Sequence, residues 1–245
     1  MKLTPKTIAA MEKHAASEYP NEACGLIVNG RYKPCKNLAE DPTKSFTIDP
    51  VVFIEAVNTG KPVAVFHTHP FDQTKPVIIP HEWPSTADMV NWMNTNVPWC
   101  IASSTSEGMS ELVWLDDSVR PPILGREFVH GITDCYSIIR DWYLFERNIN
   151  LPNFARVYDW WLQPGVDLYG SNFKAAGFTE VSKDDVQVGD VALMQIRTNV
   201  INHAAIVTGT NQLTHHLFHR LSNEDRLDRW SQYIVKYVRY TKDDS

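Results

Sequence analysis

Hydrophobic positions in the first half of the chain alternate between helical and strand periods. Thr4 and Pro5 are typical of an N-cap and the first residue of a helix, which we expect to end near Ser17. Ser85 is a second N-cap signal, before apolar residues at helical spacing. Strands that alternate with helices indicate a small layered α/β domain. The other predicted elements are a helix at 50–58 and strands at 24–28, 63–66, 100–103 and 112–114.

The second half begins with one helix and continues as a run of strands. Thr133 and Asp134 are an N-cap signal before apolar residues that recur at helical spacing from Ile138 to Phe145. A Gly-Thr-Asn turn at 209–211 is typical of a hairpin. One helix followed by antiparallel strands is an α+β pattern. The predicted strands are 190–196, 203–208, 212–217 and 233–240.

A stiff segment separates these two patterns. Pro121 and Pro122 block helix continuation and follow a pair of aspartates. We therefore predict a first domain at 1–117, a linker at 118–127 and a second domain at 128–245. If the two halves fold separately, limited proteolysis should cut between about 116 and 127.

Composition excludes several classes of protein. The chain has 245 residues, of which 43% are hydrophobic and 21% charged, so we expect a folded globular protein. A net charge of -6 gives no basic footprint, and nucleic acid is not an expected partner. No apolar run approaches the ~20 residues that span a bilayer, so membrane insertion is not expected. The charged start lacks the apolar core of a signal peptide, which predicts a cytoplasmic location. The four cysteines form no CxxC pair and are interpreted as reduced thiols.

Two histidines end the apolar run at 63–66. His67 and His69 are two residues apart, so on a strand both imidazoles point to one face and can bind one cation. Asp88 is predicted in the first turn of the next helix. Two histidines, one aspartate and an open position are typical of a catalytic zinc site, in which the metal activates water. A carboxylate has to move the proton of that water, and Glu22 is the upstream candidate.

A His-x-His pair alone is also typical of structural or surface histidines. Together with Glu22, however, the HTHP segment at 67–70 and the STAD segment at 85–88 resemble the signature of JAMM/MPN metallopeptidases, which hydrolyse amide and isopeptide bonds with zinc. The resemblance implies that His67, His69 and Asp88 are zinc ligands. It also implies Glu22 as general acid/base and Ser85 as the serine that supports the transition state.

The spacing departs from that signature. Residues 70–87 separate His69 from Asp88, which is a longer segment than in the family. An insert that leaves and re-enters a site is tolerable, since loop entropy grows slowly with length. Within it, Asp72 and His81 are alternative ligands, or the insert covers and silences the site. A solvated loop histidine is the other interpretation of His81.

A second constellation starts at Cys135, just inside the helix that follows Asp134. A helix N-terminus favours the thiolate, and its unpaired N–H groups can receive an oxyanion. His203 heads an apolar strand further on, and His215 lies past the hairpin turn. A cysteine nucleophile, a histidine base and a third polar group that orients the base form the constellation of a thiol peptidase. A structural cysteine and a core histidine are the alternatives.

The order of DC at 134–135, GD at 189–190, His203 and His215 resembles the NlpC-type cysteine peptidases. These are papain-like α+β domains that cut peptidoglycan stem peptides. The resemblance implies Cys135 as nucleophile, His203 as general base and His215 as the orienting group.

A JAMM-like domain followed by an NlpC-type domain resembles the K-type tail assembly proteins of long-tailed bacteriophages over the whole chain. This implies a hydrolase with two sites, made in the host cytoplasm and located at the virion tail tip. Its implied partners are peptidoglycan stem peptides and other tail tip proteins. The alternative is a structural assembly module in which one or both sites are vestigial, and 8 Trp, 9 Tyr and 10 Phe also suit interfaces.

Overall fold

The computed structural model describes residues 2–71, 80–118 and 120–242 of the chain. The chain divides into two compact units, residues 1–119 and residues 120–245. No helix among the described residues has the length and apolar character needed to cross a membrane.

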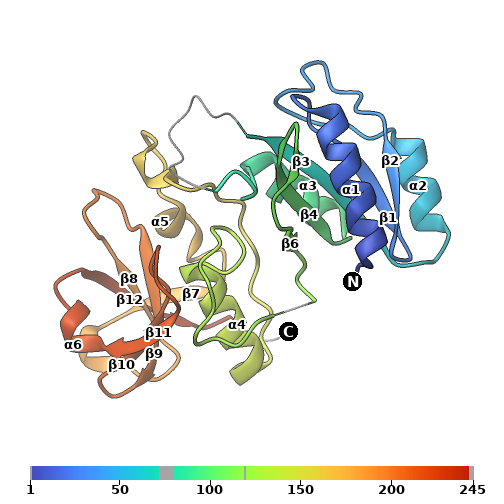
Figure 1. Cartoon of the computed structure of the whole chain (residues 1–245). Helices are drawn as coiled ribbons and strands as arrows, with labels where there is room; N and C mark the ends of the chain where they lie inside the picture. The colour runs from blue at the N-terminus through green and yellow to red at the C-terminus, as the bar shows by residue number, and fades with distance from the viewer. Residues whose placement is uncertain (1, 72–79, 119, 243–245) are drawn as a thin grey trace. The chain divides into compact units, whose positions relative to one another are not determined.

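The first unit is built on a mixed six-stranded sheet (Figure 1). Its strand order is β2-β1-β3-β4-β5, and β6 pairs with β4. Among the described residues of this unit, β3 and β4 form the one parallel pair, and α3 lies in the crossover that connects them. The strands are β1 (Cys24–Val28), β2 (Arg31–Cys35), β3 (Val63–Pro70), β4 (Trp99–Thr105), β5 (Gly108–Met109) and β6 (Val113–Leu115). The helices are α1 (Pro5–Glu18), α2 (Pro50–Asn58) and α3 (Thr86–Thr95).

The core of this unit decides which way the residues of β3 point. Phe66 is fully buried in a cluster with Met11 of α1 and Ile27 of β1. Because successive side chains of a strand point to opposite faces, His67 and His69 project from the face that Phe66 does not use. The expectation that both imidazoles share one face is confirmed.

The second unit is a six-stranded antiparallel sheet with order β11-β10-β9-β8-β12-β7. Helix α4 packs against β9. The strands are β7 (Phe178–Val181), β8 (Val191–Met194), β9 (His203–Gly209), β10 (Gln212–His215), β11 (Asn223–Arg226) and β12 (Ile234–Tyr240). The helices are α4 (Cys135–Arg147), α5 (Leu168–Asn172) and α6 (Leu227–Trp230), with 3-10 turns η1 (Trp160–Leu162) and η2 (Lys183–Asp185).

The apolar stripe of α4 fixes where its first residue lies. Ile138 and Ile139 are buried in one cluster with Ala204 and Ile206 of β9. Asp134 caps the helix, because its carboxylate accepts the N–H of Ser137 at 3.0 Å. Packing and cap together hold the N-terminal residue of α4 close to the beginning of β9.

The predicted fold class, an α/β first domain and an α+β second domain, is confirmed. Strands β2, β5, β7 and β11, helices α5 and α6 and the 3-10 turns η1 and η2 were not predicted. Residues 120–127, expected to belong to a linker, are bonded to the second unit. The Gly125 N–H donates to the Ser222 carbonyl at 2.9 Å, and Arg126 Nη1 donates to Asp141 Oδ2 at 2.6 Å.

Candidate active sites

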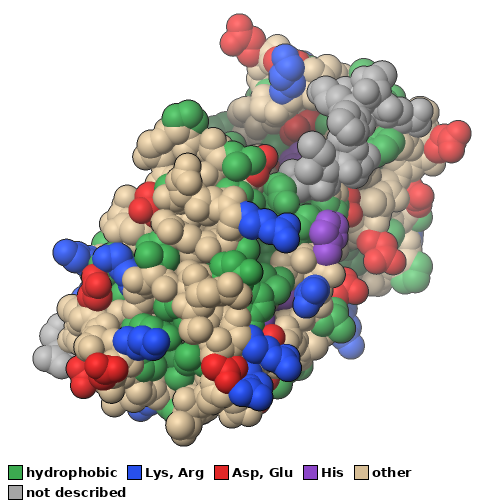
Figure 2. All heavy atoms as spheres, turned by 90° about the vertical axis from the view of Figure 1, so that its left-hand side faces the viewer, with side chains coloured by type: hydrophobic (Ala, Val, Ile, Leu, Met, Phe, Trp, Pro, Cys, Tyr) green, Lys and Arg blue, Asp and Glu red, His purple; other side chains and the backbone are tan. Residues whose placement is uncertain are grey.

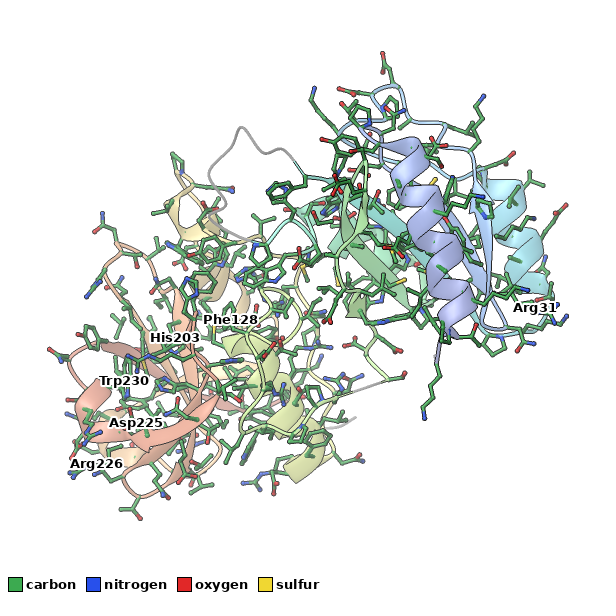
Figure 3. The ribbon with its side chains drawn as sticks, viewed as in Figure 1. Arg31, Phe128, His203, Asp225, Arg226 and Trp230 are labelled. Atoms are coloured by element: carbon green, nitrogen blue, oxygen red, sulfur yellow. The ribbon has the colours of Figure 1, made fainter. Side chains whose placement is uncertain are left out.

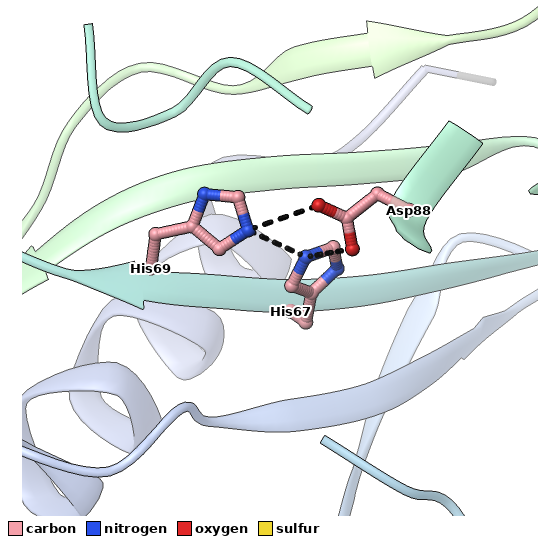
Figure 4. A group of neighbouring side chains, drawn as sticks. All are labelled: His67, His69 and Asp88. Atoms are coloured by element: carbon pink, nitrogen blue, oxygen red, sulfur yellow. Dashed lines mark hydrogen bonds and ion pairs between the residues drawn. The ribbon is translucent and has the colours of Figure 1, made fainter. Parts of the chain in front are cut away.

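His67, His69 and Asp88 come together at the end of β3 and the start of α3 (Figure 4). The two Nε2 atoms are 3.1 Å apart. His67 Nε2 lies 3.1 Å from Asp88 Oδ1, and His69 Nε2 lies 3.2 Å from Asp88 Oδ2. One ligand atom from each residue fits within 4.8 Å of the others, so the three side chains can bind a single cation.

The helix cap holds Asp88 in this position. Ser85 is the N-cap of α3, and its Oγ accepts the N–H of Asp88 at 3.2 Å. The Asp88 carboxylate accepts the Ser85 N–H at 2.7 Å, which completes a capping box. Ser85, for which a transition-state role was expected, therefore makes its observed contacts with Asp88 and is exposed.

The insert after His69 contributes a contact to the site. The His69 Nδ1–H donates to the His81 carbonyl at 2.6 Å, which leaves the Nε2 lone pair free to bind a metal. The His81 ring instead packs against Phe71, with ring centroids 4.8 Å apart. His81 is not among the converging ligands of the described residues, and Asp72 lies outside those residues.

Burial sets the protonation states of this group. His67 is fully buried, stacks on Phe46 at 4.3 Å, and its Nδ1 has no hydrogen-bond partner among the described residues. Burial lowers the pKa of His67, which keeps the imidazole in the neutral form that binds metals. Burial opposes ionisation of Asp88, but His67 and His69 outweigh it and hold the pKa of that carboxyl well below its usual range. Burial opposes protonation of His69, but Asp88 and Glu22 outweigh it and raise the pKa of this imidazole, so His69 gives up a proton when a metal binds. Two imidazoles and one carboxylate are a ligand set that fits zinc.

Glu22 lies next to the same site, on the segment that leads into the neighbouring strand β1. Cys24 of β1 is paired with His67 of β3, and the Ala23 N–H bonds Thr68 Oγ1 at 3.0 Å. Continuing this antiparallel register by two residues brings Glu22 opposite His69. Burial raises the pKa of Glu22 to about 7, with His69 opposing and Asp88 adding to the rise. A carboxyl group that titrates near neutrality suits proton transfer.

In the second unit, Cys135 is the first residue of α4 and is half-buried. Its Sγ lies 3.2 Å from the Tyr169 hydroxyl. Burial, followed by the charge of Asp134, raises the pKa of Cys135 to about 11. The thiolate expected at a helix N-terminus stays a prediction, and in this structure burial favours the protonated thiol. Burial and Cys135 also raise the pKa of Tyr169 well above its usual value, so its hydroxyl keeps its proton.

His203, which is labelled in Figure 3, forms a buried pair with His215. Ala205 is paired with His215 across β9 and β10, so His203, two residues before Ala205, is a diagonal neighbour of His215 on the same face. The His203 Nε2 lies 3.1 Å from the His215 Nδ1. The His215 ring packs against Trp230, whose indole N–H donates to Asp225 at 3.1 Å. The predicted orienting role of His215 needs a contact of this kind.

The structure brings the cysteine and the histidine pair to neighbouring positions without joining them. The N–H of Ala204, the residue after His203, is close enough to Cys135 to lower the pKa of the thiol, against the larger effect of burial. Within the described part of the chain, no hydrogen bond links Cys135 Sγ to the His203 ring. The Nε2 of His203 is used by His215, so its Nδ1 is the nitrogen that remains for a proton from Cys135.

Two residues near Cys135 were missed in the sequence. Arg156 Nε and Nη2 donate to the two oxygens of Asp134 at 2.6 and 2.8 Å, and Tyr169 contacts the thiol. The N-cap signal at Asp134 shows that a carboxylate lies at the helix end. Nothing in the sequence indicates which arginine or tyrosine reaches it from 22 or more residues away.

Comparisons with known proteins agree with this division. The model of the family described as prokaryotic homologs of the JAB domain matches residues 4–116, and the NlpC/P60 family model matches residues 125–239. The NlpC/P60 domain of the peptidoglycan hydrolase SagA superposes with a TM-score of 0.35 and 16% identity, covering 49% of this chain and 90% of that chain. The matches of the two family models show that the chain combines an N-terminal JAB-like domain with a C-terminal NlpC/P60 domain.

Two bacteriophage relatives are similar over most of this combination. The chain is 34% identical to tail tip assembly protein K of Escherichia phage N15 over 241 residues, which are 96% of this chain and 94% of the relative. It is also 34% identical to the protein of the same name from Escherichia phage lambda, over 76% of this chain and 85% of the relative. The chain belongs to the tail tip assembly protein K family, and the resemblance predicted from its motifs is confirmed.

Proposed function

We propose that the second unit is a cysteine peptidase that hydrolyses peptidoglycan stem peptides, with Cys135 as nucleophile, His203 as general base and His215 as the group that orients His203. The observation that carries this proposal is the position of Cys135 at the start of α4, next to the first residue of β9. That residue, His203, has its Nε2 3.1 Å from the His215 Nδ1 of β10. The NlpC/P60 family of this domain supports the same chemistry.

The side chains define the order of proton transfers. His203 Nδ1 takes the proton of Cys135 as the sulfur attacks the amide carbonyl, since a thiol with a raised pKa needs a base at the moment of reaction. This requires the two groups to approach each other in the substrate complex, where catalytic hydrogen bonds commonly tighten. Unpaired N–H groups at the start of α4 and the Tyr169 hydroxyl are available to the oxyanion. The proton then passes to the leaving amine, and water releases the acyl group from sulfur.

Digestion of purified peptidoglycan by the full chain tests this proposal. Cys135→Ser should abolish the release of stem-peptide fragments, because a hydroxyl is a far weaker nucleophile than a thiol. Cys35→Ser is the matched control, since Cys35 is also a free cysteine but belongs to the first unit. Equal digestion by the wild type and by Cys135→Ser contradicts a thiol peptidase. Absence of digestion by the wild type leaves the structural assembly module as the better hypothesis.

We also propose a zinc site in the first unit, held by His67, His69 and Asp88. The convergence of their ligand atoms within 4.8 Å supports it. Zinc, when bound, supplies Lewis acidity that polarises a carbonyl and activates water. Glu22 moves the proton in the hydrolysis of an amide or isopeptide bond. Ser85 holds Asp88 through the capping box and supports the transition state. The His81 carbonyl holds the His69 ring in place.

Metal analysis of the purified protein tests the site without an activity assay. We expect about one zinc per chain, lost in His67→Ala because a two-ligand remainder binds weakly. His219→Ala is the control, since His219 is exposed and belongs to the second unit. Zinc that survives in His67→Ala, or its absence from the wild type, argues against the proposal and favours a docking role for this unit.

We propose the virion tail tip as the place of action, after synthesis in the host cytoplasm, with other tail tip proteins as partners. The names of the two K relatives support this assignment. On the face drawn in Figure 2, basic and acidic side chains are interspersed. Particles that carry Cys135→Ser separate the two roles: normal assembly with impaired entry supports catalysis, and impaired assembly supports a structural module.

A further inference from the structure

A cavity of about 60 Å³ runs alongside Cys135 inside the second unit. Its walls are mostly aromatic and aliphatic side chains from α4, the segment after it, α5 and the sheet, among them Phe154, Trp160, Phe173 and Val238. One water molecule occupies roughly 10–15 Å³ of such a cavity, so the cavity holds a group of about four to six non-hydrogen atoms. A space of this size and lining suits a small apolar group bonded to, or adjacent to, the reacting sulfur.

His130 brings an unused polar group into this cavity. It lines the cavity, is 7% exposed, and neither of its ring nitrogens makes a hydrogen bond to the described residues. The Asp134 carboxylate is 4.0 Å from Nδ1, and the Val157 carbonyl is also near, but neither meets hydrogen-bond geometry. A buried polar group without a partner is costly, so this ring is available to a ligand.

The charges around the cavity cancel. The Asp134 carboxylate is neutralised by Arg156, which contacts both of its oxygens. Burial lowers the pKa of His130 to about 4, so its imidazole is neutral at physiological pH. Cys135 and Tyr169 also hold their protons. An ionised substrate group would find no counter-ion here, and the burial of an unpaired charge is strongly unfavourable.

We propose that the cavity beside Cys135 selects a small, uncharged and mainly apolar group of the substrate, with His130 as the hydrogen-bond partner of a neighbouring amide. The inference deepens the proposed peptidase function and rests on Cys135 being the reactive group. It assigns substrate selection at this position to apolar burial and a single neutral hydrogen bond. His130 is thereby a substrate-binding residue, separate from the Cys135–His203–His215 set.

Reaction of Cys135 with thiol reagents that differ in charge tests the selectivity without any hydrolysis. The probes are propyl methanethiosulfonate, its anionic 2-sulfonatoethyl analogue and its cationic 2-(trimethylammonio)ethyl analogue. Each attaches its group to the sulfur as a disulfide and releases methanesulfinate. Rates at Cys135, measured by site-resolved mass spectrometry on the full chain, are divided by the rates for 2-mercaptoethanol. We expect the propyl reagent to exceed both charged reagents by about tenfold, which corresponds to about 1.4 kcal/mol.

His130 variants test the hydrogen bond. His130→Phe keeps the ring and removes both nitrogens, whereas His130→Asn keeps a donor and an acceptor. Iodoacetamide, an uncharged amide, should react with Cys135 about fivefold more slowly in His130→Phe, as expected for one neutral hydrogen bond. The rate of iodoacetamide should recover in His130→Asn. The rate of the propyl reagent should change by less than about twofold in either variant.

Equal normalised rates for the three charge types would overturn the selectivity, and this comparison needs no variant to fold. An equal slowing of both uncharged reagents in His130→Phe, or no slowing of iodoacetamide, would overturn the role of His130. A wild type that shows the charge selectivity but does not digest peptidoglycan supports the cavity inference and removes the proposed peptidase function, so the two failures are distinguishable.

Discussion

Replacement of Arg156 by methionine should destabilise the second unit by about 3–5 kcal/mol, the range typical of breaking a buried ion pair by removing one partner. Asp134 is fully buried and receives two guanidinium hydrogen bonds, at 2.6 and 2.8 Å. The same guanidinium donates to Ser137 Oγ at 3.0 Å and to the Phe154 carbonyl at 2.6 Å. The substitution therefore leaves one charge and several polar atoms buried without a partner.

The double variant Asp134→Asn/Arg156→Met separates the charge from the cap. Asparagine is as good an N-cap as aspartate, so α4 keeps its cap while the uncompensated charge is removed. We expect the double variant to be about 2 kcal/mol more stable than Arg156→Met alone, and the comparison with both single variants gives the coupling of the pair in a double-mutant cycle. Lys236→Met is the control, because the Lys236–Glu180 pair at 2.8 Å is largely solvated and should contribute at most about 1 kcal/mol.

The pH dependence gives an independent check. Burial opposes ionisation of Asp134, but Arg156 and the bonds around it hold the pKa of this carboxyl well below its usual range. A depressed folded-state pKa contributes stability above the unfolded value of about 3.9, and this stability is lost as the pH falls through the folded pKa. In Arg156→Met the buried carboxyl has lost its counter-charge, so burial raises its folded-state pKa above the unfolded value and the variant regains stability as Asp134 takes up a proton. The difference between wild type and variant should therefore shrink as the pH drops towards 4.

Urea unfolding followed by tryptophan fluorescence measures these differences, since Trp142 and Trp160 are buried in the second unit. The free energy of unfolding is compared for the wild type, the two single variants, the double variant and the Lys236→Met control. A loss below about 1 kcal/mol in Arg156→Met, or a loss that stays constant from pH 7 to pH 4, would refute the buried-pair account.

Two further predictions concern the units themselves. Burial lowers the pKa of His203 to about 3 and of His215 to about 4, so the folded state holds both rings neutral. The second unit should therefore lose stability as the pH falls from about 6.5 to 4, by up to about 1.4 kcal/mol per pH unit for each ring. A urea midpoint that stays constant over this pH range would contradict the burial of two neutral rings. Limited proteolysis should cut first between 116 and 120, because residues 120–127 are bonded to the second unit, and a first cut within 128–145 speaks against two separately folded units.

The parts of the sites that could be predicted from the sequence depend on local rules. A two-residue spacing on a strand fixed the shared face of His67 and His69, and the caps Ser85 and Asp134 located two helix starts. Each inference needs only a few consecutive residues and the geometry of one element. For Cys135 the helix end indicates the sign of the dipole but not how much solvent the fold removes from the thiol, and burial raises its pKa.

The rest depends on contacts between distant segments. The His81 carbonyl bonds His69 from inside an insert whose length suggested a departure from the family. Arg156 reaches Asp134 from a segment without regular structure, and Tyr169 reaches Cys135 from the short helix α5. No periodicity marks such residues, because their positions follow from how the chain returns to the site. An arginine is more often a solvated surface residue, so composition gives no reason to select this one.

Both candidate sites place a functional residue in the first turn of a helix. In both, side chains from a distant segment contact the capping carboxylate of that helix. In the first unit Asp88 belongs to the capping box of α3 and contacts His67 and His69 on β3. In the second unit Asp134 caps α4 immediately before Cys135 and is held by Arg156. The first turn offers unpaired N–H groups and a fixed side-chain direction, so a residue there is oriented before any ligand arrives. Loss of either cap should therefore lower zinc affinity or thiol reactivity more than it lowers the content of helix.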